Sequence, residues 1–184
     1  MMKILGTLAT SIGLATVISF AAASAADRNG EIKLVTTLDE PRGYCVDMSG
    51  SKQTAQTNSP LQTHTCYGYQ GSIAVDQGVS SADVSKGALR FPYFKVCVIG
   101  TGVQAGSPVT LGSCPNGNTN AVVWNANGQI HPVASNSLCL TAGTSTQKGG
   151  GGSPVHLKRS LSWENCFSNS ETRQAWKLQT LTEN

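Results

Sequence analysis

Several signals are missing from this 184-residue chain. Only 12% of its residues are charged, and the net charge of +3 is scattered along the chain. Nucleic-acid-binding proteins usually carry a clustered basic patch, so the sequence predicts no nucleic-acid partner. No stretch beyond the N-terminal segment repeats apolar residues at helical spacing. Low charge with plentiful Gly, Ser and Thr is typical of a protein built from many short strands and turns.

Signatures of catalysis are missing too. The chain has no Gly-x-Ser-x-Gly elbow, no His-Glu-x-x-His helix, no phosphate-binding loop and no dinucleotide fingerprint. Its three histidines, His64, His131 and His156, are far apart, and its acidic residues are few and dispersed. Neither Cys-x-x-Cys nor paired-His spacing occurs, so no metal and no cofactor are predicted. The sequence therefore predicts a protein that is not an enzyme.

The N-terminal segment has the pattern of a signal peptide. Lys3 precedes an apolar run from Ile4 to about Ala23, and Ala23-Ser24-Ala25 is a small-x-small cleavage site. We expect residues 1–25 to be removed, leaving a secreted or periplasmic protein with no membrane span. The alternative is a retained anchor, because the run approaches bilayer length. No basic stop-transfer flank follows the run, which favours cleavage.

Six cysteines, all after this segment, suit disulfides in an exported chain. A Ser-Pro-apolar segment that leads to a cysteine occurs three times, at Ser59-Pro60, Ser107-Pro108 and Ser153-Pro154, and another cysteine lies upstream of each copy. If each copy is one structural unit, each unit contains two cysteines. The repeat therefore predicts three bridges within units: Cys45–Cys66, Cys97–Cys114 and Cys139–Cys166.

The repeat also divides the chain. We expect a lead-in at 26–41, unit one at 42–94, unit two at 95–132, and unit three with the C-terminal tail at 133–184. Three units are too few for an ordinary propeller, whereas a closed threefold barrel fits. The interval from Pro154 to Cys166 is longer than in the other copies, which predicts an insertion around 160–165. Ten residues after its second cysteine, unit one has Asp76 where the other units have tryptophan.

Short apolar runs between turn residues indicate where strands form. The best hairpin signal is Asn127-Gly128, flanked by two such runs. Strands are predicted at 32–37, 44–46, 72–75, 94–99, 108–111, 121–124, 138–141, 155–157 and 175–178.

The ordered pattern of Cys-apolar-Asp, Pro-apolar-Gln-x-aromatic-x-Cys and Gln-x-Trp resembles the ricin B-type lectin repeat, over about Gly43 to Leu178. Gln174-Ala175-Trp176 matches the last signature. Val122-Val123-Trp124 keeps only the tryptophan, and Ala74-Val75-Asp76 keeps neither residue. The resemblance implies an all-β protein, a β-trefoil of three repeated units, each with one intra-unit disulfide. It also implies a lectin, akin to family-thirteen carbohydrate-binding modules, that binds a glycan or polysaccharide without turnover.

In that family a unit can carry one shallow sugar pocket. An Asp binds sugar hydroxyls, an aromatic ring stacks on the sugar face, and Gln or Asn completes the hydrogen bonds. Unit one keeps these positions best, at Asp47, Gln62 and His64. Three further candidates lie beside them: Tyr67, Gln70 and Asp76. The structural alternative for Asp47 is that it only stabilises the bend at Ser49-Gly50.

The other two units match the family's pocket less well. Ile99 and Gly112 stand where unit two would need its Asp and its ring. Unit three has Thr141 at the Asp position, with Trp163 and His156 nearby, and the run Gly149–Gly152 is either a mobile rim loop or slack. Trp124 and Trp176 are expected in the core. These losses favour a second hypothesis, in which the chain is an accessory or toxin-associated subunit that binds a protein partner.

Overall fold

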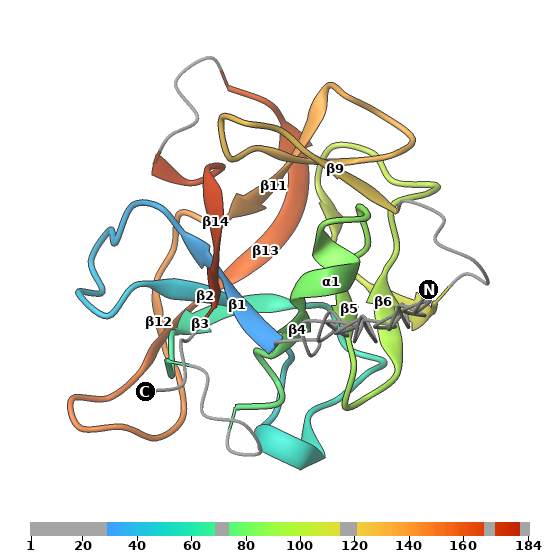
Figure 1. Ribbon diagram of the computed structural model, residues 1–184. Helices are drawn as coiled ribbons and strands as arrows, with labels where there is room; N and C mark the ends of the chain where they lie inside the picture. Colours follow the sequence, from blue (N-terminus) through green and yellow to red (C-terminus); the bar gives the residue numbers. More distant parts are fainter. Residues whose placement is uncertain (1–28, 69–73, 115–120, 168–171, 181–184) are drawn as a thin grey trace, which may run out of the picture.

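The computed structural model describes residues 29–68, 74–114, 121–167 and 172–180. The described chain is built almost entirely from short strands and turns (Figure 1), with one 3-10 turn and one four-residue helix. The predicted signal peptide lies outside the described residues. Within them, no helix is long and apolar enough to cross a membrane.

The structure has fourteen strands, one 3-10 turn and one short helix among the described residues. They are β1 (Asn29–Leu34), β2 (Tyr44–Asp47), η1 (Lys52–Thr54), β3 (Gln62–Thr65), β4 (Val79–Ser80), α1 (Ser81–Val84), β5 (Arg90–Phe91), β6 (Val96–Val98), β7 (Ser107–Pro108), β8 (Leu111–Ser113), β9 (Val122–Trp124), β10 (Ile130–Pro132), β11 (Leu138–Ala142), β12 (Gln147–Lys148), β13 (Leu157–Asn165) and β14 (Trp176–Thr180).

All the strand pairs are antiparallel. The largest sheet has nine strands in the order β11-β13-β3-β2-β1-β14, with β12 and β7 attached to β13 and β4 attached to β1. Strands β9 and β10 form a separate hairpin, and β5, β6 and β8 form a three-stranded sheet. In Figure 1, β1 (blue) and β14 (dark red) run side by side, so the two ends of the described chain meet in one sheet.

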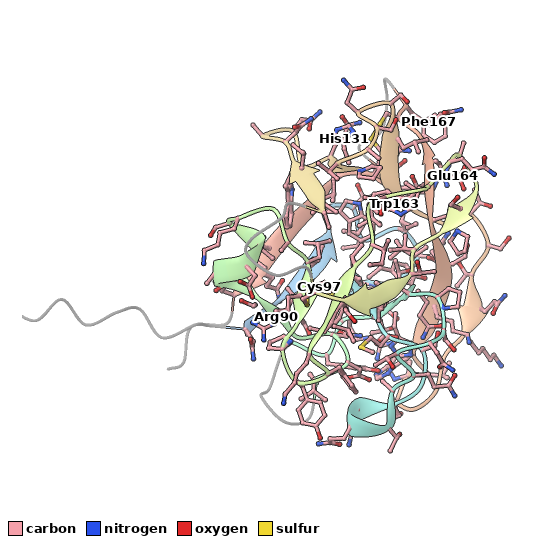
Figure 2. The ribbon with its side chains drawn as sticks, turned by 90° about the vertical axis from the view of Figure 1, so that its right-hand side faces the viewer. Arg90, Cys97, His131, Trp163, Glu164 and Phe167 are labelled. Carbon is pink, nitrogen blue, oxygen red and sulfur yellow. A yellow bond between two sulfur atoms is a disulfide. The ribbon has the colours of Figure 1, made fainter. Side chains whose placement is uncertain are left out.

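Strand β13 connects parts of the molecule that are distant in sequence. Its C-terminal half pairs with β11, and its N-terminal half pairs with β3 and β12. Its side chains alternate as in a strand with one covered face. Arg159, Leu161 and Trp163 are buried, while Ser160 is exposed. This alternation directs Trp163, which has no exposed surface, into the core (Figure 2).

The core lies between the sheets and is contributed by all of them. Ile32 and Leu34 of β1, Val98 of β6, Leu140 of β11 and Trp176 of β14 are all at most 2% exposed and belong to one cluster. Trp176 is therefore a core residue, as predicted. Its Nε1 donates a hydrogen bond to the Leu140 carbonyl at 2.9 Å.

The three predicted disulfides are present. Cys45 pairs with Cys66, Cys97 with Cys114, and Cys139 with Cys166. In each pair the first cysteine lies in a strand and the second lies just beyond the strand that pairs with it, so each bridge closes the end of a two-stranded pair. The hairpin predicted at Asn127-Gly128 is also confirmed, between β9 and β10.

Several expectations about strands and length are wrong. Of 108–111 only Pro108 and Leu111 lie in strands, and of 155–157 only Leu157 does. The strand expected at 72–75 falls partly outside the described residues, and Ala74 and Val75 lie in a bend and turn before β4. The insertion expected around 160–165 is not there, because these residues belong to β13: Ser160 pairs with Gln62 of β3, and residues 161–165 pair with β11. The extra length lies before them, where the chain forms the β12–β13 hairpin.

Candidate functional site

A pocket of about 600 Å³ lies over the first disulfide pair. One wall comes from the chain around β2 and β3 and includes Arg42, Lys52, His64 and Tyr67. The other wall comes from the loop of the β12–β13 hairpin, which contributes Gly150, Gly151, Gly152 and His156. The pocket therefore joins segments about 90 residues apart, and the second wall was not predicted.

The β12–β13 hairpin is held against β3 by main-chain pairing. Lys158 lies opposite His64, and Arg159 lies opposite Thr63. At the end of this ladder the Leu157 N–H donates to the Thr65 hydroxyl at 2.8 Å. These bonds fix the hairpin loop beside the ring of His64, so the pocket is built by the fold and does not depend on side-chain contacts alone.

A charged bridge fixes the loop from the other side. The Arg42 guanidinium donates to both carboxylate oxygens of Glu40, at 2.8 and 2.7 Å, and also to the carbonyls of Pro154 and Val155. Glu40 additionally accepts a hydrogen bond from the Thr65 hydroxyl at 2.8 Å. These bonds lower the pKa of Glu40 from 4.5 to about 2, chiefly through Arg42. The carboxylate is therefore ionised at neutral pH.

Three aromatic rings meet at the pocket. The centroid of His64 lies 5.4 Å from that of Tyr67 and 5.1 Å from that of His156, and Tyr67 and His156 are 5.5 Å apart. Such distances are those of interacting rings. His64 and Tyr67 were predicted as site residues. His156 was noted only as a neighbour of the third unit, yet the hairpin brings it to the first.

Two glycines in the hairpin loop make this approach possible. A Cβ at Gly149 would collide with the imidazole of His64. Gly152 has a φ of +76°, and a Cβ there would collide with His156. The glycine run is therefore required where the loop passes the rings. The sequence alone allowed either a mobile rim loop or a loop without a role. In the structure, Gly149 and Gly152 let the loop pack closely against His64 and His156.

Both histidines of the pocket are neutral near pH 7. Burial lowers the pKa of His64 from 6.5 to about 4, and burial also lowers the pKa of His156. His64 Nδ1 lies 3.3 Å from the Thr65 carbonyl. A carbonyl only accepts, so Nδ1 bears the proton and Nε2 is left as an acceptor.

Asp47 lies beneath the pocket and not in its lining. It is 1% exposed. Its Oδ1 accepts a hydrogen bond from Gln62 Nε2 at 2.8 Å, and its Oδ2 accepts one from Gln77 Nε2 at 3.2 Å. Burial raises the pKa of Asp47 well above its usual value, the Gln62 bond opposes this, and the nearby charge of Asp76 adds to it.

Asp76 is buried as well, and it positions the rim. Its Oδ2 accepts a hydrogen bond from the Lys52 backbone N–H at 2.8 Å, and Lys52 takes up a φ of +48° there. Its Oδ1 is buried without a hydrogen-bond partner, and burial raises the pKa of the carboxyl. Of the six residues predicted for the site, His64 and Tyr67 line the pocket, Asp47, Gln62 and Asp76 do not, and Gln70 lies outside the described residues.

Gln77 is a buried residue beside Asp76 that is not among the six predicted site residues. Its Oε1 accepts from the Tyr67 N–H at 3.1 Å, and its Nε2 donates to the Thr65 carbonyl and to Asp47. Gln174 makes the same three kinds of bond near the third disulfide. It accepts from Phe167 N–H and donates to the Asn165 carbonyl and the Thr141 hydroxyl. We call each of these arrangements a glutamine lock.

The two locks correct the alignment of the first repeat. Gln77-Gly78-Val79 corresponds to Gln174-Ala175-Trp176, so the first copy keeps its glutamine and replaces only the tryptophan. Val79 and Trp176 both lie in strands that pair with β1. Counting ten residues from Cys66 gave Asp76 instead, because the segment between cysteine and glutamine is longer in the first copy.

The strand registers locate the equivalent positions in the other pairs. Cys45 lies opposite His64, Cys97 opposite Gly112, and Cys139 opposite Glu164. The second pair thus presents no ring, as expected. In the third pair the position is Glu164, which accepts a bond from Ser162 Oγ at 2.6 Å, while Trp163 points into the core.

Two groups of metal-ligand side chains exist among the described residues, and each includes a disulfide. His131 lies against the bridge of Cys139 and Cys166 (Figure 2), and Glu31 lies near that of Cys45 and Cys66. Sulfurs in a disulfide offer no thiolate to a metal. His131 Nδ1 instead bonds the Leu138 carbonyl at 2.9 Å. These groups therefore do not form metal sites.

Comparison with solved structures identifies the fold. The C-terminal domain of an earthworm lectin, a mutant in complex with 6'-sialyllactose, matches with a TM-score of 0.55 and 17% identity over 84% of this chain and 99% of that one. The C-half of the earthworm R-type lectin in complex with GalNAc matches with a TM-score of 0.56 and 15% identity, and the coverage of both chains is the same. The β-trefoil lectin of the Vibrio vulnificus hemolysin/cytolysin, with N-acetyl-D-lactosamine bound, gives 0.53 and 14% over 87% of this chain and 99% of that one.

These likenesses show that the chain has the β-trefoil fold, as the repeat pattern predicted. No protein-family model and no curated protein sequence matches the chain.

Proposed function

We propose that this protein is an exported, non-catalytic, lectin-like protein that binds carbohydrate in the pocket between β3 and the β12–β13 hairpin. The observation that carries the proposal is the meeting of three rings, His64, Tyr67 and His156, at one pocket. Rings supply flat apolar area for the C–H face of a sugar, and the polar groups around them supply orientation. The sugar-bound trefoil lectins that share the fold support the same class of ligand.

The roles proposed for individual residues follow their positions. His64, Tyr67 and His156 contact the sugar. Asp47 and Gln62 act from below, because the carboxylate is buried and already holds two amides. The family's direct Asp contact therefore becomes, in this chain, a support for the wall that carries Tyr67.

The architecture proposed for the whole chain is three repeated units with one disulfide in each. The matching hydrogen bonds of Gln77 and Gln174 support this repeat, as does the position of each bridge at the end of a strand pair. Export is supported by the three disulfides, which persist in oxidising compartments. The boundaries at 42–94, 95–132 and 133–184 remain part of this proposal, with β1 added to the first unit because it pairs with β2 and β14.

A glycan array tests the binding proposal. We expect the purified mature chain to retain a defined set of glycans, and we expect Tyr67→Ala and His156→Ala to abolish that binding. Tyr93→Ala is the matched control, because Tyr93 is 54% exposed and does not line the pocket. Circular dichroism confirms that each variant folds. Binding to no glycan, or binding that both pocket variants retain, would refute the proposal.

A second candidate function is a protein-binding accessory subunit. The observation in its favour is the second strand pair, where Ile99 and Gly112 occupy the pocket positions and offer neither a carboxylate nor a ring. A trefoil that keeps its scaffold without its pockets can use its surface for a partner. Co-purification of one protein at fixed stoichiometry from the native source, together with no glycan binding, would favour this candidate over the first.

A further inference from the structure

Both charged side chains in the described lining of the pocket, Lys52 and Arg42, are cations. Lys52 lies at the rim, and its ammonium makes no ion pair with any described residue. Arg42 uses four of its five N–H groups on Glu40, Pro154 and Val155, which leaves one on Nη1. The Tyr67 hydroxyl has no hydrogen-bond partner among the described residues and can donate or accept.

The pocket has a neutral acceptor in His64 Nε2, but its described lining has no anionic acceptor. None of the described residues that line the pocket carries a carboxylate. Glu40 is neutralised by Arg42 at 2.7 Å. Both oxygens of Asp47 accept from glutamine amides, and the free oxygen of Asp76 is buried below. A neutral sugar needs acceptors for its own hydroxyl protons, whereas an acidic group only accepts.

From this imbalance we infer that the pocket takes an acidic sugar, whose carboxylate or sulfate group lies between Lys52 and Arg42 while its ring packs on His64, Tyr67 and His156. The inference rests on the proposed function and names its ligand class. A charged acceptor makes shorter and stronger hydrogen bonds than a neutral one. The buried carboxyls oppose it little, because Glu40 is paired and burial favours the neutral forms of Asp47 and Asp76.

Matched glycans test this inference separately from the proposed function. The array carries N-acetyllactosamine, its sialylated form, its sulfated form and uronic-acid oligosaccharides. We expect the acidic members to bind at least about fivefold more tightly than the neutral one, with the advantage decreasing as salt is raised. The sialylated, uronic and sulfated arms distinguish a carboxylate from a sulfate.

The decisive variant is Lys52→Met, with Lys86→Met as a control that removes the same charge from an exposed site outside the pocket lining. Calorimetric titration should show about a fivefold loss for Lys52→Met with the acidic glycan, no loss with the neutral one, and no loss for Lys86→Met. Equal binding of neutral and acidic glycans, or an unchanged affinity in Lys52→Met, overturns the acidic preference and leaves carbohydrate binding intact. Binding to no glycan overturns both.

Discussion

The glutamine locks allow a quantitative test of the repeat. Gln77 has no exposed surface, and truncation to alanine leaves the Tyr67 N–H and one oxygen of Asp47 without their partner. The Thr65 carbonyl loses one of two donors and keeps His64 Nδ1. Each buried group left unsatisfied costs about 1 to 3 kcal/mol, and the vacated volume adds a cavity. We expect Gln77→Ala to lower the free energy of unfolding by about 3 to 5 kcal/mol.

Gln174→Ala should cost a similar amount, because Gln174 is equally buried and its three bonds measure 2.8 to 3.0 Å. Urea denaturation with the disulfides intact measures both values, and Gln147→Ala, at an exposed strand position, is the control. A loss below about 1 kcal/mol for either lock, or a loss as large for the control, would refute the reasoning.

Substitution by glutamate should affect the stability of the two glutamine locks differently. Gln77→Glu places a carboxylate against the carboxyl group of Asp47, whereas Gln174→Glu places one against the neutral hydroxyl of Thr141. At pH 7 we expect the first variant to be less stable by at least about 1 kcal/mol. The difference should shrink at pH 4, as the carboxyls take up protons. Equal stabilities at pH 7 would show that Asp47 does not interact with this position.

Two further predictions concern pH and the core. The pKa of Glu40 is lowered from 4.5 to about 2, so the stabilising effect of its carboxylate is complete above pH 4.5 and is lost as pH falls through 2. Glu40→Gln should therefore lower the free energy of unfolding in urea by about 1 to 2 kcal/mol at pH 7 and by almost nothing near pH 2. The same cost at both pH values would contradict this linkage between protonation and stability. Trp163→Phe should cost less than Trp176→Phe in the same assay, because Trp163 Nε1 is buried without a partner whereas Trp176 Nε1 bonds Leu140; the reverse order would contradict this.

The fold could be predicted from sequence because its signals are local or covalent. The cysteine pairing, the Asn127-Gly128 hairpin and the burial of Trp176 each depend on a short pattern that one strand pair carries. Trp124 is the partial exception, since it was expected in the core and is only partly buried. A short sequence pattern predicts that two strands pair, but it does not predict how much of a side chain the neighbouring strand pairs cover.

The site was harder to predict, for two physical reasons. Gln77 was not recognised as the counterpart of Gln174, because the chain between Cys66 and Gln77 is longer than the chain between Cys166 and Gln174. Counting residues fails after such a change in length, although the hydrogen bonds of the glutamine are kept. His156 was missed as a pocket residue because it comes from a hairpin that pairs with β3 across about 90 residues. Pairing between distant strands is not encoded in either strand alone.

The comparison of the two locks also bears on why an aspartate is present at position 47. Thr141 fills the same place in the third lock with a neutral hydroxyl, so the lock itself requires only an acceptor. A buried carboxylate is the costlier choice, because burial opposes its ionisation and raises its pKa. Asp47 lies beneath the pocket with three rings, whereas Thr141 lies beside a strand position that carries Glu164 and no ring. The carboxyl group is thus retained where the proposed sugar pocket is retained, which is the pattern expected if its two bonds, to Gln62 and Gln77, support the pocket wall.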